Sequence, residues 1–307
     1  MKQSNFTLGF IITLLSSLSF GFICFLGVIF FTLGNINESI ITGLTISILL
    51  CVTSLGSSKL KQTNKNFKTC FVWEIILLIM FTGLTVFFAY TIFPHYFVVN
   101  KQSVKIQNKL NASIRKSKNI FIEYEKYANE RKLKYKDKLE SVALNHELKN
   151  GGDEYRNYEF KDNGLSNKSQ IINKMDMMQL DLFPHNYKNI KEADLSWINQ
   201  YEEIIKDWEK KPISIIDVIN NIEKKSKLSV SQLVSFSTIR EKNEVAIDFS
   251  GDLIKAESVK NHFTTPGGPT PLSLCLAVLL YLMMLLSWFT SKREINGGKT
   301  ASYEVVL

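Results

Sequence analysis

The sequence predicts an integral membrane protein dominated by α-helices. We expect four transmembrane helices and a mainly helical domain of about 170 residues between the third and the fourth. Two observations lead to this fold class. Four long stretches carry at most one charged side chain each, and nearly all the charge lies in the block from Lys101 to Lys260. The mean hydropathy is zero although 21% of the residues are charged, as expected when apolar and charged segments are segregated along a chain.

The apolar stretches predict transmembrane helices at residues 8–33, 39–55, 70–98 and 272–290. About 20 mostly apolar residues are needed to cross the hydrocarbon core of a bilayer. The first and third stretches exceed that length, and the second and fourth need short interfacial flanks. The first stretch is also longer than the roughly 7–15 apolar residues of a signal peptide, so we expect an uncleaved anchor.

Residues 100–150 predict a long basic helix or stalk. Residues 104–148 contain no Gly or Pro, and apolar residues recur at helical intervals at Ile106, Leu110, Ile114 and Phe121. One continuous helix and two shorter helices that break near Ser117 both fit this pattern.

Residues 151–265 predict a mainly helical domain. We expect a loop at residues 150–170, a helix at about 192–210, a helix capped by Ser214 and a short helix at about 231–240. The segment EVAIDF at residues 244–249 predicts a strand or an extended piece. Residues 266–271 predict a Pro/Gly tether, and residues 291–307 a cytoplasmic tail.

The distribution of Lys and Arg predicts the orientation in the membrane. The N-terminus, the second short loop and the C-terminal tail share one side in a four-span topology and hold eight basic residues, whereas the first loop holds none. The large loop has eight basic residues close to its spans, but long loops cross membranes largely regardless of charge. We therefore expect cytoplasmic termini and an extracytoplasmic large loop. A composition rich in Lys, Asn and Ile and poor in His indicates a bacterial inner membrane.

Residue patterns that carry catalysis or cofactor binding are missing from the sequence. It has no GxSxG, no phosphate-binding Gly-rich loop and no HExxH, and its four histidines are scattered. We therefore predict no catalytic residues, no metal ligands and no cofactor. Glu74 is the one charged residue inside a predicted span, which makes it a candidate intramembrane polar site. Snorkelling of its carboxylate, or pairing with nearby Lys68, is the favoured interpretation.

Two groups of residues in the large loop are candidates for binding. Trp197, Tyr201 and Trp208 lie on one helical stripe, where they form either part of the domain core or a partner-binding surface. Arg115, Lys116 and Lys118 are candidate contacts with the membrane surface or with a partner. The mixed charge of the loop argues against a nucleic-acid partner.

The order of a short first loop, a short inner loop and a large loop between spans three and four is similar to the topology of tetraspanins. Their Cys-Cys-Gly motif and paired loop cysteines are missing here, because all four cysteines lie in or beside the apolar stretches. The similarity is therefore topological, and the chain is not assigned to that family.

These features predict a non-enzymatic inner-membrane subunit or scaffold of a multiprotein envelope assembly, of the secretion or surface-export type. The partners would be other membrane or envelope proteins and the lipid bilayer, in a homo- or hetero-oligomer. One alternative is a ligand-sensing receptor that signals through a separate cytoplasmic partner. A second alternative places the large loop in the cytoplasm, where it docks an acidic protein or anionic lipid.

Overall fold

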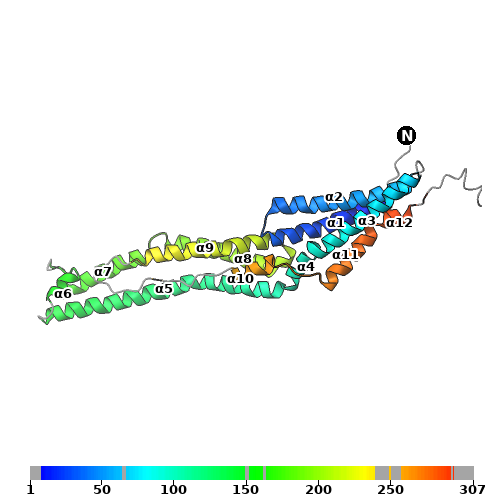
Figure 1. The fold of residues 1–307 in the computed structure, drawn as a ribbon. Helices are drawn as coiled ribbons and strands as arrows, with labels where there is room; N and C mark the ends of the chain where they lie inside the picture. The colour runs from blue at the N-terminus through cyan, green and yellow to red at the C-terminus, as the bar shows by residue number, and fades with distance from the viewer. Residues whose placement is uncertain are drawn as a thin grey trace, which may run out of the picture. The chain divides into compact units, whose positions relative to one another are not determined.

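The computed structural model describes residues 8–63, 67–148, 152–161, 164–238, 249, 257–291 and 293, and regular structure in these ranges is entirely helical. The chain divides into two compact units (Figure 1). We call Met1–Ile106 together with Lys260–Leu307 the membrane unit, and Gln107–Val259 the loop unit. The strand expected at EVAIDF falls mostly on residues 244–248, which lie outside the described ranges, and Phe249 is not in a strand.

The membrane unit contains four helical segments that are long and apolar enough to cross a membrane: Leu8–Phe31, Ile36–Lys61, Lys68–Lys101 and Pro271–Thr290. This confirms the prediction of four apolar helices. The helices are α1 (Leu8–Phe31), α2 (Ile36–Lys61), α3 (Phe67–Thr91), α4 (Phe93–Lys101), α11 (Pro271–Met284) and α12 (Leu286–Thr290). The short helix α10 (Glu257–Thr264) precedes α11.

Local sequence explains where these helices begin and end. Asn35 caps α2 by accepting a hydrogen bond from the backbone of Glu38, after a turn in which Gly34 adopts a φ of 105°. Pro94 lies in the first turn of α4, so the third span consists of two helices separated at Ile92. Thr270 and Ser273 form a capping box at the start of α11, directly after the predicted tether.

Glycines allow α1 and α2 to approach closely. A Cβ atom on Gly21 would lie 1.8 Å from Ser47 Oγ and 2.5 Å from the carbonyl oxygen of Gly43. Small residues at such crossings let membrane helices pack through their backbones. Gly21 and Gly43 are therefore part of the contact between α1 and α2. Around this crossing the helices share an apolar core that includes Phe20, Leu50 and Phe81.

The loop unit is built on α5 (Ser103–Glu147), one helix of 45 residues that does not break at Ser117. Ser117 is buried and hydrogen bonds to Ser226 at 3.0 Å, so it lies in the contact between α5 and α9 (Ser214–Phe236). The other elements are α6 (Gly152–Asn157), α7 (Asn167–Leu182), α8 (Tyr187–Lys206) and a 3₁₀ turn at Trp208–Lys210. Figure 1 shows α7 and α9 alongside α5, and side chains from these helices share one apolar cluster.

Three local predictions in the loop unit are wrong. The helices expected at Ser214 and at residues 231–240 are one helix, α9, because Ile222, Ser226, Val230 and Leu233 continue its buried stripe. Ser214 does not cap this helix, because Ile213 occupies the cap position.

The third error concerns the loop expected at residues 150–170. Residues 150–170 contain α6 and the first residues of α7, a helix that the sequence interpretation missed. The signal for α7 was present: Ser166 caps it, and Ile171, Met175, Met178 and Leu182 follow at intervals of four, three and four.

Candidate functional site

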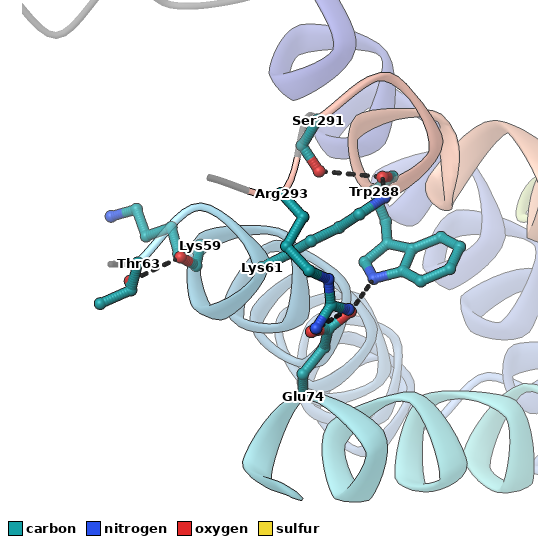
Figure 2. Close-up of polar contacts among 7 residues, drawn as sticks. All are labelled: Lys59, Lys61, Thr63, Glu74, Trp288, Ser291 and Arg293. Atoms are coloured by element: carbon teal, nitrogen blue, oxygen red, sulfur yellow. Dashed lines mark hydrogen bonds and ion pairs between the residues drawn. The ribbon is translucent and has the colours of Figure 1, made fainter. Parts of the chain in front are cut away.

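Glu74 is the centre of a polar cluster at one end of the membrane unit. Its side chain is 2% exposed. Arg293 Nη2 donates to both of its carboxylate oxygens, at 2.9 and 2.8 Å, and Trp288 Nε1 donates to Oε1 at 2.9 Å. Figure 2 shows the side chains of Arg293 and Trp288 both directed at this carboxylate. A buried carboxylate needs such partners, because desolvation of an unpaired charge is very unfavourable.

The second span also joins this cluster. Lys61 Nζ donates to the backbone oxygen of Trp288 at 2.8 Å and lies 4.1 Å from the centre of the indole ring. Lys59, by contrast, points away from the carboxylate in Figure 2. We call Glu74, Arg293, Trp288 and Lys61 the Glu74 cluster.

A neighbouring contact adds the first span. The backbone oxygen of Met284 accepts hydrogen bonds from Ser54 Oγ at 2.6 Å and from Thr13 Oγ1 at 3.0 Å. Met284 and Leu285 lie where α11 ends and α12 begins, so hydroxyl groups of α1 and α2 satisfy a carbonyl at this helix break. Polar contacts of this end of the membrane unit therefore involve all four spans.

The pairing expected of Glu74 is thus present, but its partner differs. The sequence favoured Lys68 or the interface, whereas the structure gives Arg293 and Trp288, which lie 219 and 214 positions away. Residue spacing contains no signal for such distant partners.

The three aromatic residues singled out in the loop lie inside the loop unit. Trp197, Tyr201 and Trp208 are 9%, 2% and 2% exposed. Lys225 of α9 lies over the rings of Trp197 and Tyr201, at 5.3 and 4.7 Å from their centres. These rings therefore hold α8 against α9. Binding of a partner through them stays a prediction and would require the helices to separate.

Tyr201 is a buried titratable group of the loop unit with an acidic neighbour, Asp217. Burial, followed by the charge of Asp217 and a hydrogen bond to it at 3.3 Å, raises the pKa of Tyr201 to about 12. The hydroxyl group is therefore neutral at physiological pH and donates to Asp217.

The basic residues singled out on α5 have different surroundings. Lys118 donates to Glu202 of α8 at 2.6 Å, so this lysine takes part in packing of the loop unit. Arg115 and Lys116 are exposed. No ion pair joins either of them to an acidic side chain in the ranges that the structure describes.

A groove of about 420 Å³ lies between α5 and α7, and we call it the α5–α7 groove. Ala143 and Ile171 are its buried apolar residues, while Leu144 and Ile172 are 57% and 50% exposed. Charged and polar side chains also line it: Lys136, Glu140, Glu147, Asn167 and Lys168. Asn167 is fixed between Tyr155 and Glu147 by hydrogen bonds of 2.6 and 3.0 Å, which holds the start of α7 against the end of α5. The sequence interpretation missed this groove because it missed α7.

Groups of three or more His, Cys, Asp or Glu side chains arranged to hold a metal ion do not occur among the described residues. The four cysteines are free thiols: Cys24 is buried, Cys51 and Cys70 are half-buried, and Cys275 is exposed.

Comparison with known proteins gives no further assignment. No family model, no curated protein and no solved structure matches the chain.

Proposed function

We propose that the protein is a non-enzymatic subunit or scaffold of a multiprotein membrane assembly, of the secretion or surface-export type, whose loop unit binds other envelope proteins. The observation that supports this function best is the α5–α7 groove. Its exposed Leu144 and Ile172 lie beside the buried Ala143 and Ile171, and charged residues surround them. Protein interfaces combine an apolar centre with a polar rim in this way.

The membrane unit supports a structural role rather than transport. Ionisable side chains inside a membrane are typical markers of a substrate or ion pathway. Among the described residues of the spans, the buried acidic side chain is Glu74, and it is already paired with Arg293 and Trp288. The polar groups near it join helices to one another.

The proposal includes a location. With cytoplasmic termini, Lys59, Lys61 and Arg293 lie at the inner surface, in agreement with the preference of basic residues for that side. The loop unit is then extracytoplasmic, on the outer side of a bacterial inner membrane, where envelope partners are accessible.

Site-specific crosslinking tests the function. A photo-reactive amino acid is placed at Ile172 in the full chain, and a control is placed at Leu228, which is 60% exposed on α9 and does not line the groove. We expect one or a few defined envelope proteins to crosslink at position 172 and not at 228.

A substitution completes the experiment. Leu144→Glu, made in the chain that carries the probe at 172, should abolish the crosslink, whereas Leu228→Glu should leave it unchanged. Equal crosslinking at 172 and 228, or purification from mild detergent as a lone monomer, would argue against the proposal.

A ligand-sensing receptor is the second candidate, and the volume of the groove favours it. Pockets for small molecules span about 300–1,000 Å³, and the groove of about 420 Å³ falls in that range. A sensor would be stabilised against thermal unfolding by its small-molecule ligand without any protein partner, and Ile172→Glu would remove that stabilisation.

A further inference from the structure

Helix α5 exposes a line of large apolar side chains on the side that faces away from the core of the loop unit. Ile122, Leu133 and Leu144 are 63%, 60% and 57% exposed, whereas Tyr124 and Leu139 of the same helix are buried in the apolar cluster. The three exposed residues follow one another at intervals of 11. Three turns of an α-helix contain about 10.8 residues, so the three lie on one line about 33 Å long. We call Ile122, Leu133 and Leu144 the α5 stripe.

The core of the loop unit does not account for the α5 stripe. From residue 107 to residue 147, these three are the large apolar side chains of α5 that are exposed. An apolar repeat of 11 residues is one of the periods with which α-helices pair side by side along their length. The stripe therefore has the spacing of a helix-pairing face, and the charges beside it indicate which helix fits.

The charged residues closest to the stripe differ between its two halves. Lys126 lies between Ile122 and Leu133, whereas Asp137 and Glu140 lie between Leu133 and Leu144. At about 100° per residue, each of these three charged residues lies within about 40° of the stripe. All three are exposed. The stripe is therefore basic on the N-terminal side of Leu133 and acidic on its C-terminal side.

A second copy of α5 in antiparallel register matches this pattern. Ile122 and Leu144 are each 11 positions from Leu133, so a two-fold axis at Leu133 places Ile122 of one copy level with Leu144 of the other. Lys126 and Glu140 are each seven positions from Leu133, so they too become level across the pair. A parallel register would place Lys126 beside Lys126 and Glu140 beside Glu140. Charge complementarity thus selects the antiparallel pair, in which both copies contribute the same surface.

We propose that the protein self-associates through the α5 stripe, with α5 of a second copy packed antiparallel against it. Within one copy, Lys126 lies 3.9 Å from Glu130, and Glu140 lies 3.6 Å from Lys136. Exposed ion pairs of this kind contribute little to stability. Lys126 and Glu140 are therefore able to turn towards each other across the pair, where the apolar stripe excludes water.

This inference goes beyond the proposed function, because it concerns a second copy of the chain and not another envelope protein. Leu133 does not line the α5–α7 groove, so its substitution leaves the groove residues unchanged. Copies in one membrane can form the pair when α5 runs along the surface, and copies in two facing membranes can form it when α5 projects. Both arrangements are accessible to the full chain in detergent.

Sedimentation equilibrium of the purified full chain in density-matched detergent tests the proposal. The wild type should form a reversible dimer. Leu133→Glu places two carboxylates on the two-fold axis and should raise the dissociation constant at least about tenfold, because like charges in an interface repel strongly. The control Leu228→Glu replaces a leucine of α9 that is also 60% exposed and should leave the constant unchanged. Helicity measured by circular dichroism should be the same in all three proteins.

Exchange of charges tests the register. Lys126→Glu should weaken the dimer several-fold, since it faces acidic residues twice in the symmetric pair. The triple variant Lys126→Glu, Asp137→Lys, Glu140→Lys reverses both halves of the stripe and should restore the affinity of the wild type. A parallel pair predicts no such restoration, because like charges would still lie side by side.

Disulfide formation reads the register directly, in a chain whose four native cysteines are replaced. Facing positions of two packed helices are close enough for a disulfide. Leu133→Cys alone should therefore give a disulfide-linked dimer. Ile122→Cys alone and Leu144→Cys alone should not, because equal positions lie about 33 Å apart in the antiparallel pair. A mixture of these two proteins should give a linked heterodimer, and Leu228→Cys should give none.

Each contrary outcome overturns the proposal. A monomeric wild type, or equal dissociation constants for Leu133→Glu and Leu228→Glu, would show that the stripe does not pair. A linked dimer from Ile122→Cys alone would show a parallel arrangement. Crosslinks from Ile172 to other envelope proteins would still support the proposed function in these cases, so the two proposals fail separately.

Discussion

Arg293 and Glu74, 219 positions apart in the sequence, form a buried ion pair in which one guanidinium nitrogen contacts both carboxylate oxygens, at 2.9 and 2.8 Å. Trp288 donates a third hydrogen bond to the same carboxylate. The pair joins the segment that follows α12 to the third span. Its loss has a direct physical consequence, because Glu74 has almost no access to solvent.

Arg293→Ala should therefore destabilise the protein strongly. Removing one partner of a buried ion pair typically costs about 3–5 kcal/mol, since the other charge remains buried. Because the Arg293 side chain is 26% exposed, we expect a value at or below the lower end. Thermal unfolding of the full chain in mild detergent measures the effect. The control Lys59→Ala removes an exposed cation at the same end of the membrane unit and should change the stability by less than about 0.5 kcal/mol. The double variant Glu74→Gln, Arg293→Ala should be more stable than Arg293→Ala, and the opposite order would contradict a role as charge partners.

Gly21→Ala should disrupt the packing of α1 against α2. The new methyl group would lie 2.5 Å from the backbone oxygen of Gly43, which cannot rotate away. Overpacking of this kind costs roughly 1–3 kcal/mol. Gly83→Ala is the matched control in α3, where a Cβ atom meets no atom within 4 Å. We expect a lower unfolding temperature for Gly21→Ala and an unchanged or slightly higher one for Gly83→Ala. Equal effects of the two substitutions would show that close approach at Gly21 is unimportant.

Tyr201 should make folding stability depend on pH in the alkaline range. Its pKa rises from 10.0 to about 12 in the folded protein, chiefly because of burial. Between these two pH values the folded protein holds a proton that the unfolded chain has lost. This contribution to the free energy of unfolding is therefore fully present below pH 10 and decreases as the pH rises towards 12. Tyr201→Phe should weaken the pH dependence of unfolding between pH 10 and 12, measured by denaturant titration. An unchanged pH dependence of unfolding in Tyr201→Phe would contradict this contribution of Tyr201.

Labelling of introduced cysteines should reveal the orientation. Asn173 is an exposed position on α7 at which a cysteine can be introduced. Ser166 is unsuitable for the same purpose, because its hydroxyl group caps α7. In a chain whose four native cysteines are replaced, Asn173→Cys should react with a membrane-impermeant thiol reagent in intact spheroplasts. Lys59 lies near the end of the second span that the proposed orientation places at the cytoplasmic surface. Lys59→Cys should therefore react only after lysis. The reverse pattern would place the loop unit in the cytoplasm and favour docking of an acidic protein or anionic lipid there.

The sequence by itself determined the number of apolar helices and the helical nature of the large loop. Uncharged runs such as residues 8–33 identify a span locally, because length and hydropathy are properties of contiguous residues. The helical character of residues 104–148 was predicted for a similar reason: they lack Gly and Pro, and Ile106, Leu110 and Ile114 recur on one face. The pattern did not distinguish one continuous helix from two helices that break near Ser117, and the structure shows one. Helix α7 was predictable in the same way, from its cap at Ser166 and the spacing of Ile171, Met175 and Met178.

Only the tertiary structure decided which side chains meet. The partners of Glu74 come from a segment more than 200 positions away. Sequence spacing gives no reason to choose Arg293 rather than Lys68 as the ion-pair partner of Glu74. The close approach of α1 and α2 at Gly21 and Gly43 likewise follows from the packing of two helices of one chain. The α5–α7 groove likewise depends on two helices folding against each other. Helical periodicity reveals the face that each helix buries, whereas the partner of that face is set by packing over the whole chain.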